Sequence, residues 1–169
     1  MHHSNLLVLS GDPHRAPTAR YRSDLRRLRA SDPAVRAMTD FLREPPLTAA
    51  EDCALDTALD DMFRLGVRAF LVVRDLTVVG LITAEAIRQA RRSAATRIVE
   101  VMTAAADMPA IDWQTLQDST IRDLMEIFEG ARVDHLVVLE SKTAQHASVR
   151  GVVHRSRVER RLHLSADPL

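Results

Sequence analysis

The sequence contains few of the residues that cross-link a chain, bind metals through sulfur or stack on nucleic acid bases. Its 169 residues include one cysteine, one tryptophan and one tyrosine. The single cysteine, Cys53, excludes an internal disulfide and a zinc site built from several cysteines. It lies just before an apolar stretch with helical spacing, which favours a role as a small packing residue.

Long hydrophobic runs are also absent. A membrane-spanning helix needs about 20 consecutive apolar residues, and the longest runs, near Phe70 and Leu136, have only the length of a strand. The apolar run at residues 6–9 is too short for the core of a signal peptide. With 46% hydrophobic and 27% charged residues, the composition is that of an ordinary folded protein. We therefore expect a cytoplasmic protein without a membrane segment.

The net charge is zero, but the charges are unevenly distributed. Residues 1–30 carry six arginines against two aspartates, a net charge of +4, and residues 150–169 carry five arginines against two acidic residues, +3. Arginine suits phosphate groups, so basic ends can attract nucleic acid. The N-terminal segment has one aromatic residue, Tyr21, and no recognisable nucleic-acid-binding module. We therefore expect solvated ends, with nucleic-acid association through the basic termini as the weaker alternative.

Two parts of the chain repeat one pattern. Met38-Thr39 recurs as Met102-Thr103, and similar segments follow each copy for roughly fifty residues. A unit repeated once, without a catalytic cluster inside it, indicates a paired scaffold with binding clefts between the copies. The apolar positions of the first copy match apolar positions of the second: Leu55, Leu59, Met62, Val67 and Val72 correspond to Ile121, Met125, Phe128, Val133 and Val138.

Each copy predicts the order strand, helix, strand, strand, helix. In the first copy, residues 46–48 predict a short entry strand, and apolar residues at helical spacing predict a helix that Gly66 ends. Residues 70–73 and 78–82 predict a hairpin, and Thr83 caps the last helix. The spacing also predicts that three large side chains belong to the core: Met62, Phe63 and Phe128.

The second copy follows the same order, with its entry strand at residues 110–112 and a longer hairpin. Ser156 and Glu159 form a capping-box pattern that predicts a last helix starting two residues later than in the first copy. Short helices are expected before each Met-Thr pair. One begins near Ser31 or Asp32, and the other covers residues 97–102.

These elements predict an α/β (α+β) fold of two βαββα units. A three-stranded sheet of this size cannot bury both faces alone, so we expect the two small sheets to pack face to face with pseudo-twofold symmetry. We assign the chain to four parts: a flexible basic arm at residues 1–30, a first motif at 31–92, a second motif at 93–163 and a tail at 164–169.

The chain resembles tandem CBS-domain proteins, whose paired unit is called a Bateman module. The resemblance rests on the Met-Thr pairs, the entry strands, the amphipathic helices and the closing segments at Gly80 and Gly151, and covers about residues 31–163. It implies a regulatory module without catalysis. Such modules bind AMP, ADP, ATP or S-adenosylmethionine between the two units, signal to a partner protein and form homodimers, and they require no cofactor.

An enzyme is not expected, because the sequence shows no nucleophile with a base, no metal cage and no glycine-rich phosphate loop. The histidines show no metal-ligand spacing either. The resemblance instead implies ligand-binding positions in both copies. The candidate ligand-binding residues are Pro46, Leu47, Thr48, Arg68, Ala69, Phe70, Thr83, Ala86, Ile111, Asp112, His135, Leu136, His154, Arg155 and Arg157.

Neither copy keeps the aspartate that holds the ribose in the family's G-x-x-T-x-x-D stretch. The first copy has Thr83 but carries Ala86 at the aspartate position, and the second carries His154 and Arg157 at the threonine and aspartate positions. Arg155 and Arg157 near a helix N-terminus are unfavourable unless an anion joins them; simple exposed arginines are the alternative. Because both aspartates are absent, a second hypothesis is that the protein is a homodimeric interaction scaffold that has kept the fold and no longer binds the ligand.

Overall fold

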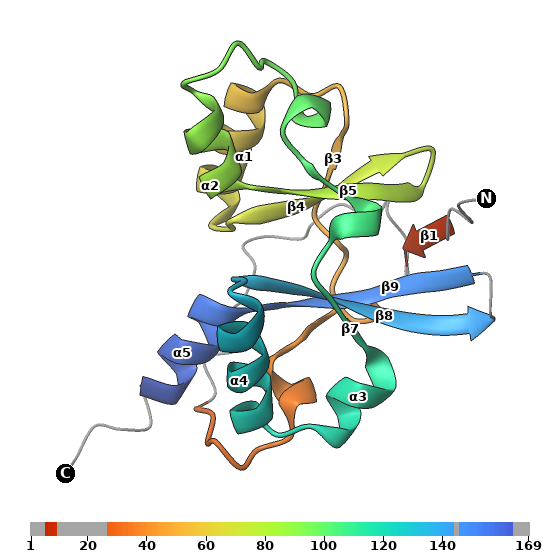
Figure 1. Cartoon of the computed structure of the whole chain (residues 1–169), viewed down its shortest axis with the longest axis vertical. Helices are drawn as coiled ribbons and strands as arrows, with labels where there is room; N and C mark the ends of the chain where they lie inside the picture. The colour runs from red at the N-terminus through yellow and green to blue at the C-terminus, as the bar shows by residue number, and fades with distance from the viewer. Residues whose placement is uncertain (1–5, 10–26, 144–145, 164–169) are drawn as a thin grey trace. The chain divides into compact units, whose positions relative to one another are not determined.

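The computed structural model describes residues 6–9, 27–143 and 146–163, which form two compact units (Figure 1). Unit 1 contains Pro45–Met108 and the strand β1 (Leu6–Leu9). Unit 2 contains the described residues of Ser23–Glu44 and Pro109–Leu169. None of the helices in these described ranges is long and apolar enough to cross a membrane.

Unit 1 is a small sheet with two helices. Strand β3 pairs in parallel with β4, a connection that requires the intervening helix α1 as a crossover. Strand β5 pairs antiparallel with β4, and the short strands β1 and β6 pair with β5. The elements are β3 (Thr48–Ala50), α1 (Leu55–Leu65), β4 (Ala69–Arg74), β5 (Thr77–Thr83), α2 (Ala84–Ala90), η2 (Ile98–Glu100), β6 (Thr103–Ala104) and η3 (Ala105–Asp107).

Unit 2 repeats this plan, with one extra helix after its entry strand. Strand β7 is parallel to β8, and β9 is antiparallel to both β8 and the short strand β2. The expected fold of two βαββα units with small sheets is thus confirmed. The elements are η1 (Ala34–Ala37), β2 (Thr39–Asp40), β7 (Ala110–Asp112), α3 (Trp113–Asp118), α4 (Ile121–Ala131), β8 (His135–Thr143), β9 (His146–His154) and α5 (Arg155–His163).

Helix α1 illustrates how the local sequence determines where a helix ends and which of its faces is buried. Its apolar residues recur on one face and are buried, while Gly66 adopts the left-handed conformation, with a φ angle of 70°, that ends the helix. Met62 is 1% exposed, as predicted, but Phe63 is 71% exposed. The prediction that Phe63 belongs to the core is therefore wrong. Adjacent helical residues point about 100° apart, and this places Phe63 beyond the edge of the buried face that Leu55, Ala58, Leu59 and Met62 form.

The two Met-Thr segments join the opposite unit from the one their repeat suggests. Strand β2, which contains Thr39, pairs with β9 of unit 2, whereas β6, which contains Thr103, pairs with β5 of unit 1. The compact units therefore differ from the sequence repeats at 31–92 and 93–163. The spacing of apolar residues predicts which face of a helix or strand is buried, but it does not predict which sheet a two-residue strand joins.

The predicted N-terminal arm contains parts of the fold. Leu28 is fully buried in the core of unit 2, three residues before the expected start of the fold near Ser31. Strand β1 also lies inside the segment predicted as a flexible arm. The helices expected before each Met-Thr pair are single 3-10 turns, η1 and η2. The predicted tail at residues 164–169 lies outside the described residues.

Candidate functional site

In unit 1, the first group of candidate residues lies where β3 and β4 begin. Thr48 is opposite Leu71 in the parallel pair, and the Leu71 N–H donates to the Leu47 carbonyl oxygen at 3.1 Å. Pro46 is buried, and Phe70 is 4% exposed within the core of unit 1. Parallel pairing thus brings Pro46, Leu47 and Thr48 beside the start of β4.

The second group lies where β5 passes into α2. Ala69 is opposite Thr83 in the hairpin, and the Ala84 N–H donates to the Arg68 carbonyl oxygen at 2.9 Å. The Thr83 hydroxyl oxygen accepts a hydrogen bond from the Ala86 N–H at 3.1 Å, which is the cap expected from the sequence. The first-copy candidates therefore form one corner of unit 1, with only small side chains at positions 69 and 86.

Glu85 does not replace the missing aspartate in this corner. Its carboxylate accepts hydrogen bonds from Arg88 at 2.9 Å and from Gln89 at 3.1 Å, both one turn further along α2. The hydrogen bond from Arg88, and then that from Gln89, lowers the pKa of Glu85 below its ordinary value. The carboxylate is therefore held along the outer side of its own helix.

In unit 2, the corresponding corner holds two histidines. His135 at the start of β8 is directly opposite His154 at the end of β9, and their rings meet edge to face with centroids 4.2 Å apart. Leu136 is buried beside them, and the Arg155 N–H donates to the Asp134 carbonyl oxygen at 2.9 Å. Strand pairing creates this contact, so the sequence spacing could not reveal it.

The predicted capping box in the second copy is wrong. Helix α5 begins at Arg155, the position equivalent to Ala84 in α2, so it does not start late. The Glu159 carboxylate accepts a hydrogen bond from Arg155 Nε at 2.8 Å, and Ser156 is exposed. This hydrogen bond raises the pKa of the Arg155 guanidinium above its ordinary value. An ion pair on the helix surface has replaced the cap.

Arg157 occupies the family's aspartate position and bonds inside its own unit. Its Nη1 donates to the Thr39 hydroxyl oxygen at 2.8 Å, and Thr39 is 3% exposed. Its Nε is buried and has no hydrogen-bond partner among the residues that the structure describes. The alternative reading of Arg157 as a simple exposed arginine is therefore wrong, because its guanidinium faces the Met-Thr segment.

The entry strands align differently from the sequence-based correspondence. Thr48 is opposite Leu71, and Ala110 is opposite Val137. Because Leu71 and Val137 are equivalent, the counterpart of Thr48 is Ala110, and Asp112 lies two residues further along. In the second copy, fewer residues separate the Met-Thr pair from the entry strand, and an extra helix, α3, follows that strand. Sequence alone does not locate such compensating length changes.

Ile111 and Asp112 consequently have structural roles in unit 2. Ile111 is 6% exposed and belongs to the hydrophobic core. The Asp112 carboxylate accepts a hydrogen bond from the Gln114 N–H at 2.8 Å, so Asp112 is the N-cap of α3. In the described ranges, no group of three histidine, cysteine or acidic side chains is placed to hold a metal ion.

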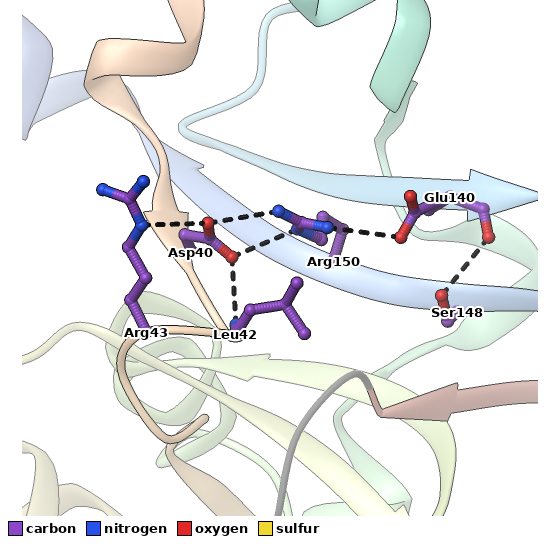
Figure 2. A network of polar contacts seen from close by, with 6 residues as sticks. All are labelled: Asp40, Leu42, Arg43, Glu140, Ser148 and Arg150. Carbon is purple, nitrogen blue, oxygen red and sulfur yellow. Dashed lines mark hydrogen bonds and ion pairs between the residues drawn. The ribbon is translucent and has the colours of Figure 1, made fainter.

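A polar network that the sequence does not predict surrounds Arg150 (Figure 2). Its guanidinium donates to the two Asp40 carboxylate oxygens at 3.1 and 3.3 Å, and its Nη1 lies 3.5 Å from a Glu140 carboxylate oxygen. The guanidinium carbon also lies 4.7 Å from the centroid of the Trp113 ring. The side chains of Arg150 and Asp40 are only 16% and 17% exposed. No local pattern predicts a pair so far apart in the sequence.

Three arginines of β9 and α5 hold the segment that ends in β2. Besides Arg150 and Arg157, the buried Arg161 donates from Nη1 to the Arg36 carbonyl oxygen at 2.9 Å. We call Arg150, Arg157 and Arg161 the arginine clamp. The equivalent positions of unit 1 carry the apolar residues Val79, Ala86 and Ala90.

The free energy that the Arg150–Asp40 pair of the arginine clamp contributes to folding can be measured. Because both side chains are mostly buried, we expect a double-mutant cycle with Arg150→Met and Asp40→Asn to give a coupling of about 1–3 kcal/mol. The measurement is urea denaturation of the wild type, both single variants and the double variant. The exposed pair Arg91–Asp56, at 3.7 Å, is the control and should couple by less than about 0.5 kcal/mol. Equal coupling in both cycles would contradict the structural role of the clamp.

Comparison with known proteins agrees with this geometry. Residues 37–93 match the family model described as the CBS domain. No curated protein matches the sequence significantly. Among solved structures, an uncharacterized conserved protein from Pyrococcus horikoshii has a TM-score of 0.58 at 17% identity, over 84% of this chain and 98% of that chain.

Two further solved structures are described as ligand complexes. The CBS domain pair of protein MJ0100, in complex with 5′-methylthioadenosine and S-adenosyl-L-methionine, has a TM-score of 0.56 at 18% identity, over 77% of this chain and 99% of that chain. CBSX2 in complex with AMP has a TM-score of 0.56 at 14% identity, over 80% and 99% of the two chains. At these identities the similarity establishes the fold. Residues 37–93 are therefore similar to the CBS domain, and the chain has the fold of a CBS-domain pair.

Proposed function

We propose that this protein is a non-catalytic sensor that binds an adenosine-type ligand and passes the change to a partner protein. The observation that carries the proposal is the corner of unit 1, where the starts of β3 and β4 meet the N-terminus of α2. An adenine ring needs an apolar surface with polar groups at its edge, and the half-buried Leu47 offers apolar surface at the start of β3. The MJ0100 and CBSX2 complexes with adenosine compounds support this assignment.

The charge at the corner of unit 2 favours a phosphorylated ligand there. Small, uncharged side chains occupy the corner of unit 1 at Ala69 and Ala86. The corner of unit 2 carries the guanidinium of Arg157 instead. A cationic environment attracts phosphate and repels a sulfonium cation. We therefore propose AMP, ADP or ATP ahead of S-adenosylmethionine.

Restoring the aspartate at position 86 is the direct test. Ala86 is half-buried in the first turn of α2, where a carboxylate is favourable with the helix dipole. Ala86→Asp should raise the affinity for AMP about tenfold, because a hydrogen bond to a charged group contributes about 1.5 kcal/mol. Calorimetric titration of the full chain measures the change.

The matched control is Gln89→Asp, which adds the same charge one turn further along α2, where the side chain is exposed. It should leave the affinity for AMP unchanged. The proposal fails if neither the wild type nor Ala86→Asp binds any of the four ligands at millimolar concentration. An equal gain in both variants would show a nonspecific charge effect in place of ribose recognition.

The bond between Arg157 and Thr39 favours a second candidate function, a homodimeric interaction scaffold. The guanidinium fills the position of the ribose-holding carboxylate and uses one of its donors inside the protein. In this second function, the family's ribose-binding carboxylates are absent at Ala86 and Arg157 because the fold is retained for protein contacts alone. Native mass spectrometry of the freshly purified protein separates the two functions, because a copurifying adenosine compound is incompatible with the scaffold.

We also propose that the protein is a homodimer, as the resemblance to paired CBS modules implies. The support from this chain is the exposed aromatic side chain of Phe63 on α1.

A further inference from the structure

Arg157 is a half-buried cation that has no charged partner within the described ranges. Its Nη1 donates to the neutral Thr39 hydroxyl oxygen, and its buried Nε has no hydrogen-bond partner among these residues. Arg150 in the same unit contrasts with it, because its guanidinium contacts the carboxylates of Asp40 and Glu140. Burying a charge is costly unless the charge is paired. The lack of an acidic partner for Arg157 therefore requires an explanation.

The edge of this guanidinium that lacks a partner is the edge that binds oxyanions. Arginine presents a planar fork in which two N–H groups donate side by side to two oxygens of a carboxylate or a phosphate. Because Nη1 points to Thr39, the remaining fork consists of Nε and Nη2. Arg157 is therefore oriented to receive an anion in a bidentate manner while its third nitrogen stays bonded to the protein.

The equivalent position of unit 1 differs in both size and charge. Ala86 occupies it in the first turn of α2, and Glu85 adds an acidic residue to that turn, whereas the first turn of α5 contains no acidic residue. Strand pairing makes Thr103 the counterpart of Thr39. Thr103 is exposed, but Thr39 beside Arg157 is buried. The cation is thus a property of unit 2 and does not follow from the shared fold.

The structural role of Arg157 in the arginine clamp does not require a charge. Strand β2 is already held by its pairing with β9 and by the bond from Arg150 to Asp40. A neutral donor would serve the Thr39 hydroxyl at a lower desolvation cost. A cation in the first turn of a helix is also unfavourable unless an anion joins it. The charge of Arg157 therefore indicates that it binds an anionic group of a ligand.

The class of ligand depends on the function proposed above, on which this inference rests. The resemblance places the ribose beside position 157. In dinucleotide-binding folds, an acidic residue holds a free ribose hydroxyl, whereas an arginine accommodates a phosphate on the ribose. We propose that the corner of unit 2 binds an adenine nucleotide with a phosphate on the 2′ or 3′ oxygen of its ribose, and that Arg157 recognises this phosphate through Nε and Nη2.

Calorimetric titration of the full chain with matched ligands tests the proposal. Adenosine 2′,5′-bisphosphate and adenosine 3′,5′-bisphosphate carry their second phosphate on the ribose, whereas ADP carries both phosphates in a chain on the 5′ oxygen. ADP therefore controls for the added negative charge. The wild type should bind one of the two bisphosphates about tenfold more tightly than ADP, because a hydrogen bond to a charged group contributes enough for that difference.

Two substitutions at position 157 separate recognition from structure. Arg157→Gln keeps a donor for Thr39 but removes the charge, and it should abolish the preference for the bisphosphate. Arg157→Asp places a carboxylate beside the ribose and should reverse the preference, so that ADP binds more tightly. The matched control is Arg160→Gln, which removes the same charge from an exposed position of α5. It should leave the preference unchanged, and circular dichroism should show that the variants fold.

The outcomes distinguish this inference from the proposed function. A wild type that binds ADP and both bisphosphates equally would overturn the inference and leave the nucleotide function intact. A preference that survives Arg157→Gln, or that is lost equally in Arg160→Gln, would also overturn it. A wild type that binds neither AMP, ADP nor a bisphosphate would contradict both proposals. Binding of a bisphosphate that depends on Arg157 supports both.

Discussion

Gly151→Ala is expected to lower the free energy of unfolding by about 3 kcal/mol, at the upper end of the usual cost of overpacking. An added Cβ would lie 2.8 Å from both Cγ and Sδ of Met38, and closer still to the carbonyl oxygen of Thr39. The Met-Thr segment at this point is backbone paired with β9, so it cannot move aside without losing that pairing.

Urea denaturation measures this loss, and Gly130→Ala provides the matched control. Gly130 lies in α4, and a Cβ added there meets nothing within 4 Å. The control should stabilise the protein by up to about 1 kcal/mol, because alanine is the better helix former. A Gly151→Ala variant with the stability of the wild type would contradict the close packing of the Met-Thr segment on β9.

Phe128→Ala should cost roughly 3–5 kcal/mol, the usual penalty for removing a buried phenylalanine. Phe128 is fully buried in the core of unit 2, together with Leu124 and Leu136. The substitution leaves a cavity beneath α4 that the surrounding side chains cannot fill completely. This residue should therefore be one of the most costly to truncate in the chain.

Phe63→Ala is the control for this prediction, because helical spacing predicts both phenylalanines as core residues. Since Phe63 is 71% exposed, its truncation should change the free energy of unfolding by less than about 0.5 kcal/mol in dilute protein, where association does not contribute. Thermal or urea denaturation of both variants compares them directly. Similar losses for the two variants would refute the difference in burial.

Much of the fold could be predicted from local sequence. Gly66 ends α1 with the expected left-handed conformation, and Thr83 caps α2 through its hydroxyl oxygen. These features involve residues within a few positions of each other, so their physics is contained in short segments. The repeated order of strands and helices follows from the same local signals, and it is the basis of the resemblance to CBS-domain pairs.

The candidate site was predictable only in outline. The order of the elements along the chain was enough to predict that the entry strands lie beside the later hairpins. The first-copy candidates do share one corner of unit 1. The role of Asp112 as a helix cap and the bond from Arg157 to Thr39 were not predictable. Each depends on where an insertion falls, or on which sheet a distant segment joins.

The sequence by itself determined the two βαββα units, their helix ends and most of their apolar positions, because these depend on periodicity and on neighbouring residues. Only the tertiary structure decided that the segment ending in Thr39 packs on β9, that His135 meets His154, and that Arg150 pairs with Asp40. These contacts join residues far apart in the chain. These contacts stabilise the folded protein only once the strands have paired, so no local sequence pattern predicts them.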